Sequence, residues 1–398
     1  MSTNKPKCYA PFYNVYLRAS SKESKVCCMS TQSHTLESNA MSEVFNNPLA
    51  QEVRSSMIKG DWHSVCSGCE QREASNLRSD RHMYNEWYEE AVKHSTLAPL
   101  DTLMPEPIWA DIRPSNLCNL KCRMCYPDNS TEIAREEAQM PRHLRPNRNT
   151  DNELELLSSR KQYELPELNN VVNLKLLGGE PTVQQEVFDI LERVNYNENS
   201  MVHITTNASN VTQYKRIVPL LNKFAQVSWG ISIDGYGAGY EYVRTPARWS
   251  KFSEAVDYLT STQSGRLNTI VSFNVCVQAW NFSNIPETLE YITSVEDKLG
   301  AYSNIHYGST HLGLVQQPHL SLSVVPDLIK SFIIEYAHSK NINKELLSQF
   351  ISLTHSQNYS EELVEKFLQH TETLDNVRNT GFDSVDPALM LRLRTVTS

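Results

Sequence analysis

The chain has 398 residues, of which 40% are hydrophobic and 21% are charged. This length predicts two or three domains with enough apolar surface to bury a core. The net charge of -9 argues against general nucleic-acid binding, and no apolar run reaches the ~18 residues that a membrane span needs. The N-terminal stretch lacks a signal-peptide pattern, so we expect a cytoplasmic protein with reduced thiols and no membrane partner.

Residues 1–80 are rich in cysteine and are expected to be irregular, apart from one hairpin over residues 13–29. Cys66 and Cys69 form a C-x2-C pair, to which earlier cysteines could add two more metal ligands. In general such a set is more often a zinc site than an iron–sulfur site. The earlier cysteines are Cys8, Cys27 and Cys28. From the residues alone, a zinc site, an iron–sulfur cluster and reduced free thiols all remain possible.

Residues 81–105 follow as a helical connector, with a helix expected from residue 85. From residue 106 to 325, strand candidates alternate with amphipathic helices, which predicts a parallel sheet. Six such units would form a partial (β/α)6 TIM barrel, whose active site collects at the C-terminal ends of the strands. The strands are expected at 107–113, 172–177, 201–206, 227–233, 269–277 and, weakly, 304–309. The helices are expected at 131–139, 183–194, 211–224, 250–261 and 286–295.

Two further segments complete the expected architecture. Residues 141–165 are polar and contain two prolines, which predicts a surface loop. Residues 326–398 are expected to form a C-terminal helical extension, with helices over 327–340, 344–355 and 360–379.

Three cysteines follow the first strand candidate of the barrel with the spacing C-x3-C-x2-C: Cys118, Cys122 and Cys125. A loop this short can bring three thiolates onto one cluster of four irons and leave one iron without a protein ligand. An iron with an open position can bind a reactant. The alternative is half of a zinc site that takes its fourth ligand from elsewhere.

A second motif follows the next strand candidate. Gly178 and Gly179 would let backbone amides approach a ligand closely, and Glu180 could accept a hydrogen bond from a ligand ammonium group. The alternative is an ordinary strand-to-helix turn in which Pro181 opens the helix.

Together the two motifs resemble those of the radical S-adenosylmethionine (SAM) enzymes. The resemblance implies that a 4Fe–4S cluster on the three cysteines binds SAM at its open iron. It also implies that one electron splits SAM into methionine and a 5′-deoxyadenosyl radical, which removes hydrogen from a substrate carbon. Glu180 and the two glycines would bind the SAM amino group.

The same resemblance implies further cofactor-binding residues. Met124 would enclose the adenine, although many relatives carry an aromatic residue there. Arg244 would bind the SAM carboxylate, and three polar residues would face the same mouth. The three polar residues are Asn207, Ser232 and Asp234. As alternatives, Asn207 could cap the next helix and Asp234 could form a turn.

Beside such a barrel, the N-terminal cysteines resemble a SPASM/twitch auxiliary-cluster domain, although that domain usually follows the barrel. The resemblance implies a second 4Fe–4S cluster on Cys8, Cys66, Cys69 and either Cys27 or Cys28. It also implies a peptide or protein substrate and a one-electron donor such as flavodoxin or ferredoxin. Open alternatives are a nucleotide, sugar or small-metabolite substrate, and a non-catalytic iron–sulfur electron carrier or scaffold.

One further cysteine and three histidines lie outside these motifs. Cys276 lies in an apolar run and is expected to be a buried core thiol. The three histidines near the last strand candidate are expected to be structural or exposed: His306, His311 and His319.

Overall fold

The computed structural model describes residues 7–19, 21–74, 78–93, 106–146, 165–194, 196, 199–261, 268–300 and 305–397. The chain divides into two compact units. The first comprises Met1–Asn116, Ser158–Ile204 and Leu220–Val227, and the second comprises Leu117–Leu157, Thr205–Pro219 and Ser228–Ser398. Most of the polar loop predicted at 141–165 lies outside the described residues. No helix in the described ranges is both long and apolar enough to cross a membrane.

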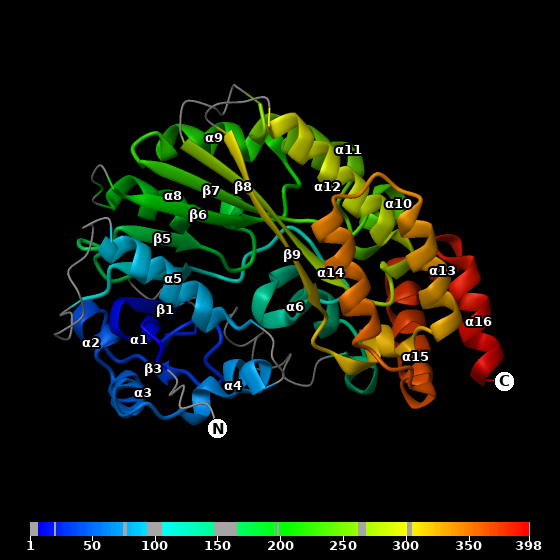
Figure 1. Ribbon diagram of the computed structural model, residues 1–398, viewed down its shortest axis with the longest axis horizontal. Coiled ribbons are helices and arrows are strands. Elements are labelled where there is room, and N and C mark those ends of the chain that lie inside the picture. Colours follow the sequence, from blue (N-terminus) through cyan, green and yellow to red (C-terminus); the bar gives the residue numbers. More distant parts are fainter. Residues whose placement is uncertain are drawn as a thin grey trace. The chain divides into compact units, whose positions relative to one another are not determined.

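A mainly parallel sheet organises the first unit, with the strand order β3-β2-β1-β4-β5-β6 (Figure 1). The predicted hairpin is present, because β1 and β2 pair antiparallel. The remaining pairs of β1, β4, β5 and β6 are parallel. The bounds are β1 Asn14–Arg18, β2 Glu23–Lys25, β3 His34–Thr35, β4 Trp109–Arg113 and β5 Asn173–Leu176, while β6, Met201–Thr206, begins in this unit.

Helices fill the N-terminal region that we expected to be irregular, so that expectation was wrong. Helix α3, Pro48–Lys59, begins where the Asn47 side chain accepts a 3.0 Å hydrogen bond from the backbone of Ala50, and it ends at Gly60 in the left-handed conformation. Asn47, Pro48 and Gly60 are ordinary capping signals for a helix, and the prediction of an irregular region did not take them into account. The neighbouring helices are α1 Ala10–Tyr13, α2 Met41–Phe45 and α4 Ser67–Ala74, with α8 at Gln185–Arg193.

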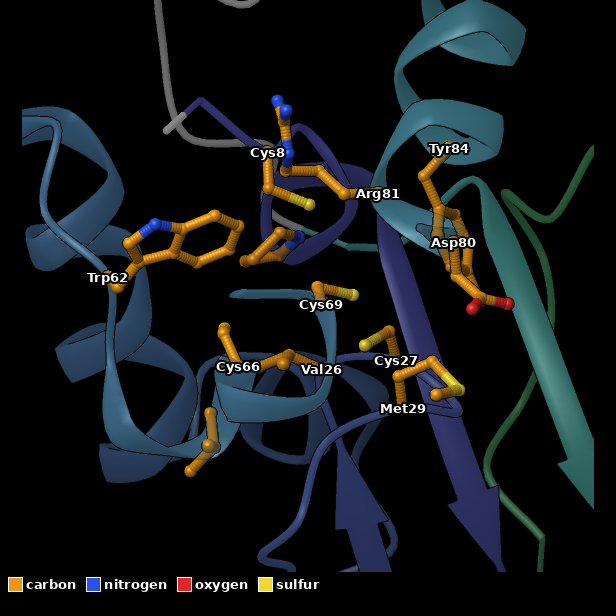
Figure 2. A pocket seen from close by; sticks show the side chains of 12 residues that line it. Cys8, Val26, Cys27, Met29, Trp62, Cys66, Cys69, Asp80, Arg81 and Tyr84 are labelled. Carbon is orange, nitrogen blue, oxygen red and sulfur yellow. The ribbon is translucent and has the colours of Figure 1, made fainter. Parts of the chain in front are cut away.

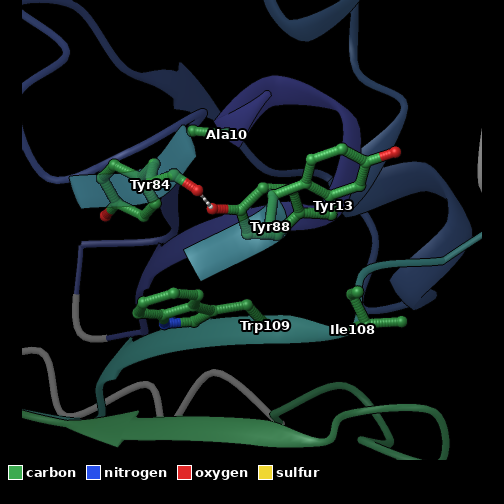
Figure 3. Close-up of a cluster of buried hydrophobic side chains, with 6 residues drawn as sticks. All are labelled: Ala10, Tyr13, Tyr84, Tyr88, Ile108 and Trp109. Carbon is green, nitrogen blue, oxygen red and sulfur yellow. Dashed lines mark hydrogen bonds between the residues drawn. The ribbon is translucent and has the colours of Figure 1, made fainter. Parts of the chain in front are cut away.

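The connector helix is present as α5, Asp80–Lys93, and aromatic residues anchor it in the first unit. Figure 3 shows Tyr84 and Tyr88 of this helix in one buried cluster with Tyr13 and Trp109. The Tyr13 hydroxyl donates a 2.7 Å hydrogen bond to the backbone carbonyl of Tyr84. Because the partly buried residues against this cluster include Cys8, Cys27 and Cys28, it forms one wall of the N-terminal cysteine region.

The second unit also combines parallel strands with helices. Strands β8 and β9 pair in parallel, with one irregularity between Val271 and Phe273. All the helices predicted here are present, and two helices of this unit were not predicted, α10 and α16. The elements are α6 Thr131–Ala138, α9 Val211–Leu221, β7 Gln226–Ser232, α10 Gly237–Val243, α11 Trp249–Leu259, β8 Asn268–Val277, α12 Ile285–Leu299, β9 Ile305–Leu314, α13 Asp327–His338, α14 Lys344–His355, α15 Glu361–Arg378 and α16 Pro387–Thr397; α9 and β7 each lie partly in the first unit.

Each predicted barrel strand thus has an observed counterpart whose bounds agree within a few residues, except that β9 continues to Leu314. The alternation of buried and less buried residues along β6 and β8 explains why these strands could be found from sequence. The protein has a mixed α/β fold with parallel strands and many helices. Its closure into a partial barrel stays a prediction.

Candidate functional site

The cysteine loop, residues 118–125, lies in the second unit between β4 and α6 along the chain. Its three cysteines form no disulfide among the described residues and are partly exposed. A turn brings the backbone N–H of Cys125 to 3.0 Å from the Cys122 carbonyl. The backbone N–H groups of Lys121 and Arg123 donate to the carbonyls of Thr245 and Val243, at 2.6 and 2.9 Å. The loop is therefore fixed to the segment at the end of α10.

Arg123, between the second and third cysteines, supplies the strongest attachment of the loop. Its side chain is fully buried, and its Nη2 donates to Asp375 at 2.6 Å and to Thr380 at 2.7 Å. Its guanidinium lies 3.6 Å from the ring centroid of Tyr242, a cation–π contact. A buried guanidinium needs such partners because desolvation of an unpaired charge is costly.

A second ion-pair group holds the residue before Cys122. Glu136 of α6 accepts from Lys121 at 2.8 Å and from Arg378 of α15 at 2.6 Å. Burial opposes ionisation of this carboxyl, but the hydrogen bonds from Arg378 and Lys121 hold the pKa of Glu136 below its usual value. Helix α15 therefore supports both neighbours of Cys122, through Asp375 on one side and Arg378 on the other.

Asp234 and Arg244, both predicted to bind cofactor, form a buried ion pair at 2.6 Å. Asp234 also accepts a 2.7 Å hydrogen bond from the backbone of Cys276. The Nε atom of Arg244 is buried and has no hydrogen-bond partner among the residues that the structure describes. Burial raises the pKa of the Cys122 thiol, and the charge of Arg244 opposes this effect.

The prediction that Cys276 is a buried core thiol needs correction. On β8, Phe273, Val275 and Val277 are buried, whereas Cys276 lies on the alternate, less buried face. The sequence carries this signal, because Ser272 and Asn274, four and two residues before Cys276, are polar and share its face of the strand. Burial still raises the pKa of this thiol, and the charge of Asp234 adds to the shift.

The other predicted cofactor residues of the second unit are Met124, Asn207 and Ser232. The carbonyl of Met124 accepts from Gln317 at 3.1 Å. Asn207 donates to Asn119 at 3.0 Å and accepts from the backbone of Ser209 at 3.0 Å, so it forms a turn before α9 and links it to the cysteine loop. Ser232 is the half-buried last residue of β7.

The glycine–glutamate motif lies in the first unit. Gly178 has φ +108°, and a Cβ atom there would lie 2.8 Å from the carbonyl oxygen of Ser115, so only glycine fits without strain. Glu180 is buried and accepts from the backbone and the hydroxyl of Thr182, at 3.1 and 2.7 Å. The motif forms a turn that leads into a short 3-10 helix at Pro181–Val183. Its binding of the SAM amino group stays a prediction.

Four cysteines of the first unit line a single pocket, which we call the cysteine pocket: Cys8, Cys27, Cys66 and Cys69. Figure 2 shows their side chains around one space, with Trp62 and Arg81 beside them. The pocket encloses about 400 Å³, including solvent at its mouth. Burial raises the pKa of Cys8 to about 12 and that of Cys66 to about 11, so both thiols are protonated at neutral pH without metal.

Cys28 faces a different environment from its neighbour Cys27. It does not line the cysteine pocket, and its sulfur lies 3.6 Å from the Tyr84 hydroxyl, which donates to it. The same hydroxyl lies 3.1 Å from Asp111 of β4. The spacing in the sequence hardly favoured either Cys27 or Cys28 as a ligand. The structure gives the two cysteines different surroundings.

Apolar side chains surround the cysteine pocket on a second side. Val26, Val53 and Val65 form a buried cluster against which Cys8, Cys27 and Cys66 pack. Over the described ranges, no three His, Cys, Asp or Glu side chains are placed to hold a single metal ion. A four-iron cluster is larger than one ion, so its cysteine ligands stand farther apart than those of zinc.

The predictions for three histidines can also be compared with the structure. His306 and His311 of β9 are exposed, as expected. His319 is half-buried and its Nε2 lies 2.9 Å from Nδ1 of His370 on α15. Sequence reasoning gave no reason to consider His370.

Comparison with known proteins adds a family match to the mixed α/β fold and the cysteine loop. Residues 112–292, which include the cysteine loop and the glycine–glutamate motif, match the model of the Radical SAM superfamily. This match covers less than half of the chain, and it shows that the segment is similar to radical SAM superfamily domains. No curated protein matches the chain.

Solved structures similar to the chain include SuiB of Streptococcus suis bound to its precursor peptide SuiA, at 15% identity and a TM-score of 0.34. The match covers 76% of this chain and 63% of that one. SuiB bound to S-adenosylmethionine matches at 15% identity and a TM-score of 0.33, with 76% and 61% coverage.

The ion pair between Arg123 and Asp375 gives a prediction about stability. Asp375→Asn leaves the buried Arg123 charge without its carboxylate, so the free energy of unfolding should fall by about 3 kcal/mol. Asp383→Asn is the matched control, because Asp383 pairs with Arg394 at the surface and the change should cost less than about 1 kcal/mol. Urea denaturation of both variants measures the difference. Equal losses would contradict a structural role for the buried pair.

Proposed function

We propose that the protein is a radical SAM enzyme whose 4Fe–4S cluster is held by Cys118, Cys122 and Cys125. The match of residues 112–292 to the superfamily model carries this proposal. Three cysteines without a disulfide on one short, well-anchored loop fit the group, because thiolates are the usual ligands of such clusters. When bound, the reduced cluster would supply the electron that cleaves SAM to methionine and a 5′-deoxyadenosyl radical.

The chain's own residues would bind and orient SAM. Glu180 would accept a hydrogen bond from the SAM ammonium group, and Gly178 and Gly179 would let the backbone come close to it. Arg244 would donate to the SAM carboxylate, and its buried Nε without a partner in the described residues supports this role. Met124 would contact the adenine region, and Asn207, Ser232 and Asp234 would complete the polar surroundings.

We further propose an auxiliary 4Fe–4S cluster in the cysteine pocket, held by Cys8, Cys27, Cys66 and Cys69. Four cysteines around one space suit a closed cluster with no open iron. The apolar clusters beside the pocket would limit solvent access and so influence the reduction potential of the cluster. Loading requires loss of the thiol protons, so cluster assembly should release protons.

The proposed organisation is a twitch-like domain over residues 1–80, a helical connector over 81–105, a partial radical SAM barrel over 106–325 and a helical extension over 326–398. The substrate would be a peptide or protein, and a cytoplasmic flavodoxin or ferredoxin would supply electrons. The peptide preference rests on the resemblance of the N-terminal cysteines to auxiliary-cluster domains. The rival function is a non-catalytic iron–sulfur carrier, which would not need Gly178, Gly179 and Glu180.

The first test replaces Cys118, Cys122 and Cys125 together with alanine. After anaerobic reconstitution with iron and sulfide, the wild-type protein should form 5′-deoxyadenosine from SAM and dithionite, and the triple variant should form none. The variant should keep the auxiliary cluster and so lose only about four irons per chain. Unchanged cleavage in the variant would exclude the loop as the active centre, and no cleavage by fully loaded, well-reduced wild type would favour the carrier.

The second test uses the cysteine doublet as its own control. Cys27→Ser removes a residue that lines the cysteine pocket and should abolish the auxiliary cluster, whereas Cys28→Ser should retain it. Iron and sulfide analysis, made in the background of the triple alanine variant, measures each cluster by itself. Loss of iron in Cys28→Ser with retention in Cys27→Ser would reverse the assignment, and zinc without sulfide in the pocket would contradict the cluster.

A further inference from the structure

A second pocket lies within the second unit, beside the cysteine loop. Its walls come from that loop, α6, the segment after β9, and α15, and we call it the α6–α15 pocket. Arg123 and Cys125 contribute from the loop, Glu136 from α6, and His370 and Arg378 from α15. The pocket encloses about 380 Å³, including solvent at its mouth.

Three nitrogen atoms from residues that line this pocket are buried and lack a hydrogen-bond partner within the described part of the chain. They are Nη1 of Arg123, Nε2 of His370 and Nη1 of Arg378. The side chains of the two arginines are at most 1% exposed. Buried polar atoms without partners are rare and costly, so three of them around one pocket indicate a missing hydrogen-bonding group.

The charges around the pocket are already matched, which narrows the chemistry of that group. Asp375 neutralises Arg123 at 2.6 Å, and Glu136 pairs with Arg378 at 2.6 Å and with Lys121 at 2.8 Å. Glu137, which is also buried, lines the pocket as a third carboxylate. A bound anion would meet no excess positive charge and would lie near two carboxylates. A neutral acceptor, such as a carbonyl oxygen, satisfies the guanidinium donors without this repulsion.

His319 and His370 determine which hydrogen-bonding group of a ligand could face Nε2 of His370. Burial lowers the pKa of His370 to about 3, so its ring is neutral and carries one N–H. Nδ1 of His370 and Nε2 of His319, 2.9 Å apart, share one hydrogen bond. When His370 donates in this bond, its Nε2 is an acceptor, and when His319 donates, Nε2 of His370 is a donor. A peptide group offers a carbonyl and an N–H, so it can serve either tautomer.

We propose that the α6–α15 pocket binds a backbone peptide group of the substrate, with Arg123 and Arg378 donating to carbonyl oxygen and His370 contacting the adjoining backbone. The substrate class rests on the proposed function. Because the contacts would be made to the backbone, the pocket would hold a peptide beside the cysteine loop with little regard for its side chains.

The test measures binding of N-acetylglycine N-methylamide, a minimal peptide unit, to the full chain by ligand-observed NMR. The probe should bind, sodium acetate should bind more weakly, and His370→Phe should raise the Kd of the probe about tenfold through loss of a buried hydrogen bond. His355→Phe is the matched control, because His355 is an exposed histidine at the end of α14, and its Kd should be unchanged.

Crystals soaked with the probe identify the site directly and should show its carbonyl oxygen bonded to Arg123 and Arg378. Ordered water alone in the pocket, stronger binding of acetate, or equal Kd values in His370→Phe and wild type would each overturn the proposal. If His370→Phe does not fold, as judged by its melting temperature, Arg378→Lys replaces it, since lysine keeps the charge facing Glu136 but lacks the second guanidinium nitrogen.

This experiment is separable from the test of the proposed function, because it needs neither SAM nor electron transfer. Probe binding without any 5′-deoxyadenosine formation would refute the radical SAM activity and leave the peptide site standing. SAM cleavage without probe binding would refute the peptide site and leave the radical SAM activity standing.

Discussion

The buried guanidinium of Arg123 is the constraint on which the cysteine loop depends. The loop has no regular secondary structure around its cysteines, so its own backbone hydrogen bonds cannot fix it. A desolvated cation is stable only with partners, and these come from Asp375, Thr380 and the ring of Tyr242. Two of the partners lie at or beyond the last turn of α15. The C-terminal helices are therefore part of the folding of the cysteine loop and not an independent appendage.

The same helix carries a second constraint of the same kind. Arg378 reaches Glu136 of α6, and Glu136 in turn reaches Lys121, so the residues on both sides of Cys122 are tied to charged partners. Matched charges of this kind give geometric specificity more than net stability, because each pair must repay its desolvation. A loop held this way has its three thiols positioned by contacts within the protein. The pairing leaves Nη1 of Arg123 and Nη1 of Arg378 buried without a hydrogen-bond partner among the described residues.

Local patterns predicted much of the fold. The strands β4 to β8 and the helices between them follow ordinary apolar periodicity, and the hairpin of β1 and β2 was found in the same way. Helix α3 was not predicted although Asn47 caps it, and α10 and α16 were not predicted either. The pairing of Arg123 with Asp375 spans 252 residues and leaves no local signature. His370 could not be singled out for the same reason, since only the fold brings it to His319.

The cysteine doublet shows how tertiary packing decides what spacing cannot. Cys27 and Cys28 are equivalent in sequence, yet Cys27 lines the cysteine pocket between two apolar clusters and Cys28 faces Tyr84. The aromatic residues of α5 impose this division, because Tyr84 is buried and its hydroxyl must find polar partners, which it does in Cys28 and Asp111. A thiol occupied there is turned away from a shared ligand. The different surroundings of the two neighbouring sulfurs thus depend on a tyrosine hydroxyl from a helix more than fifty residues away in the chain.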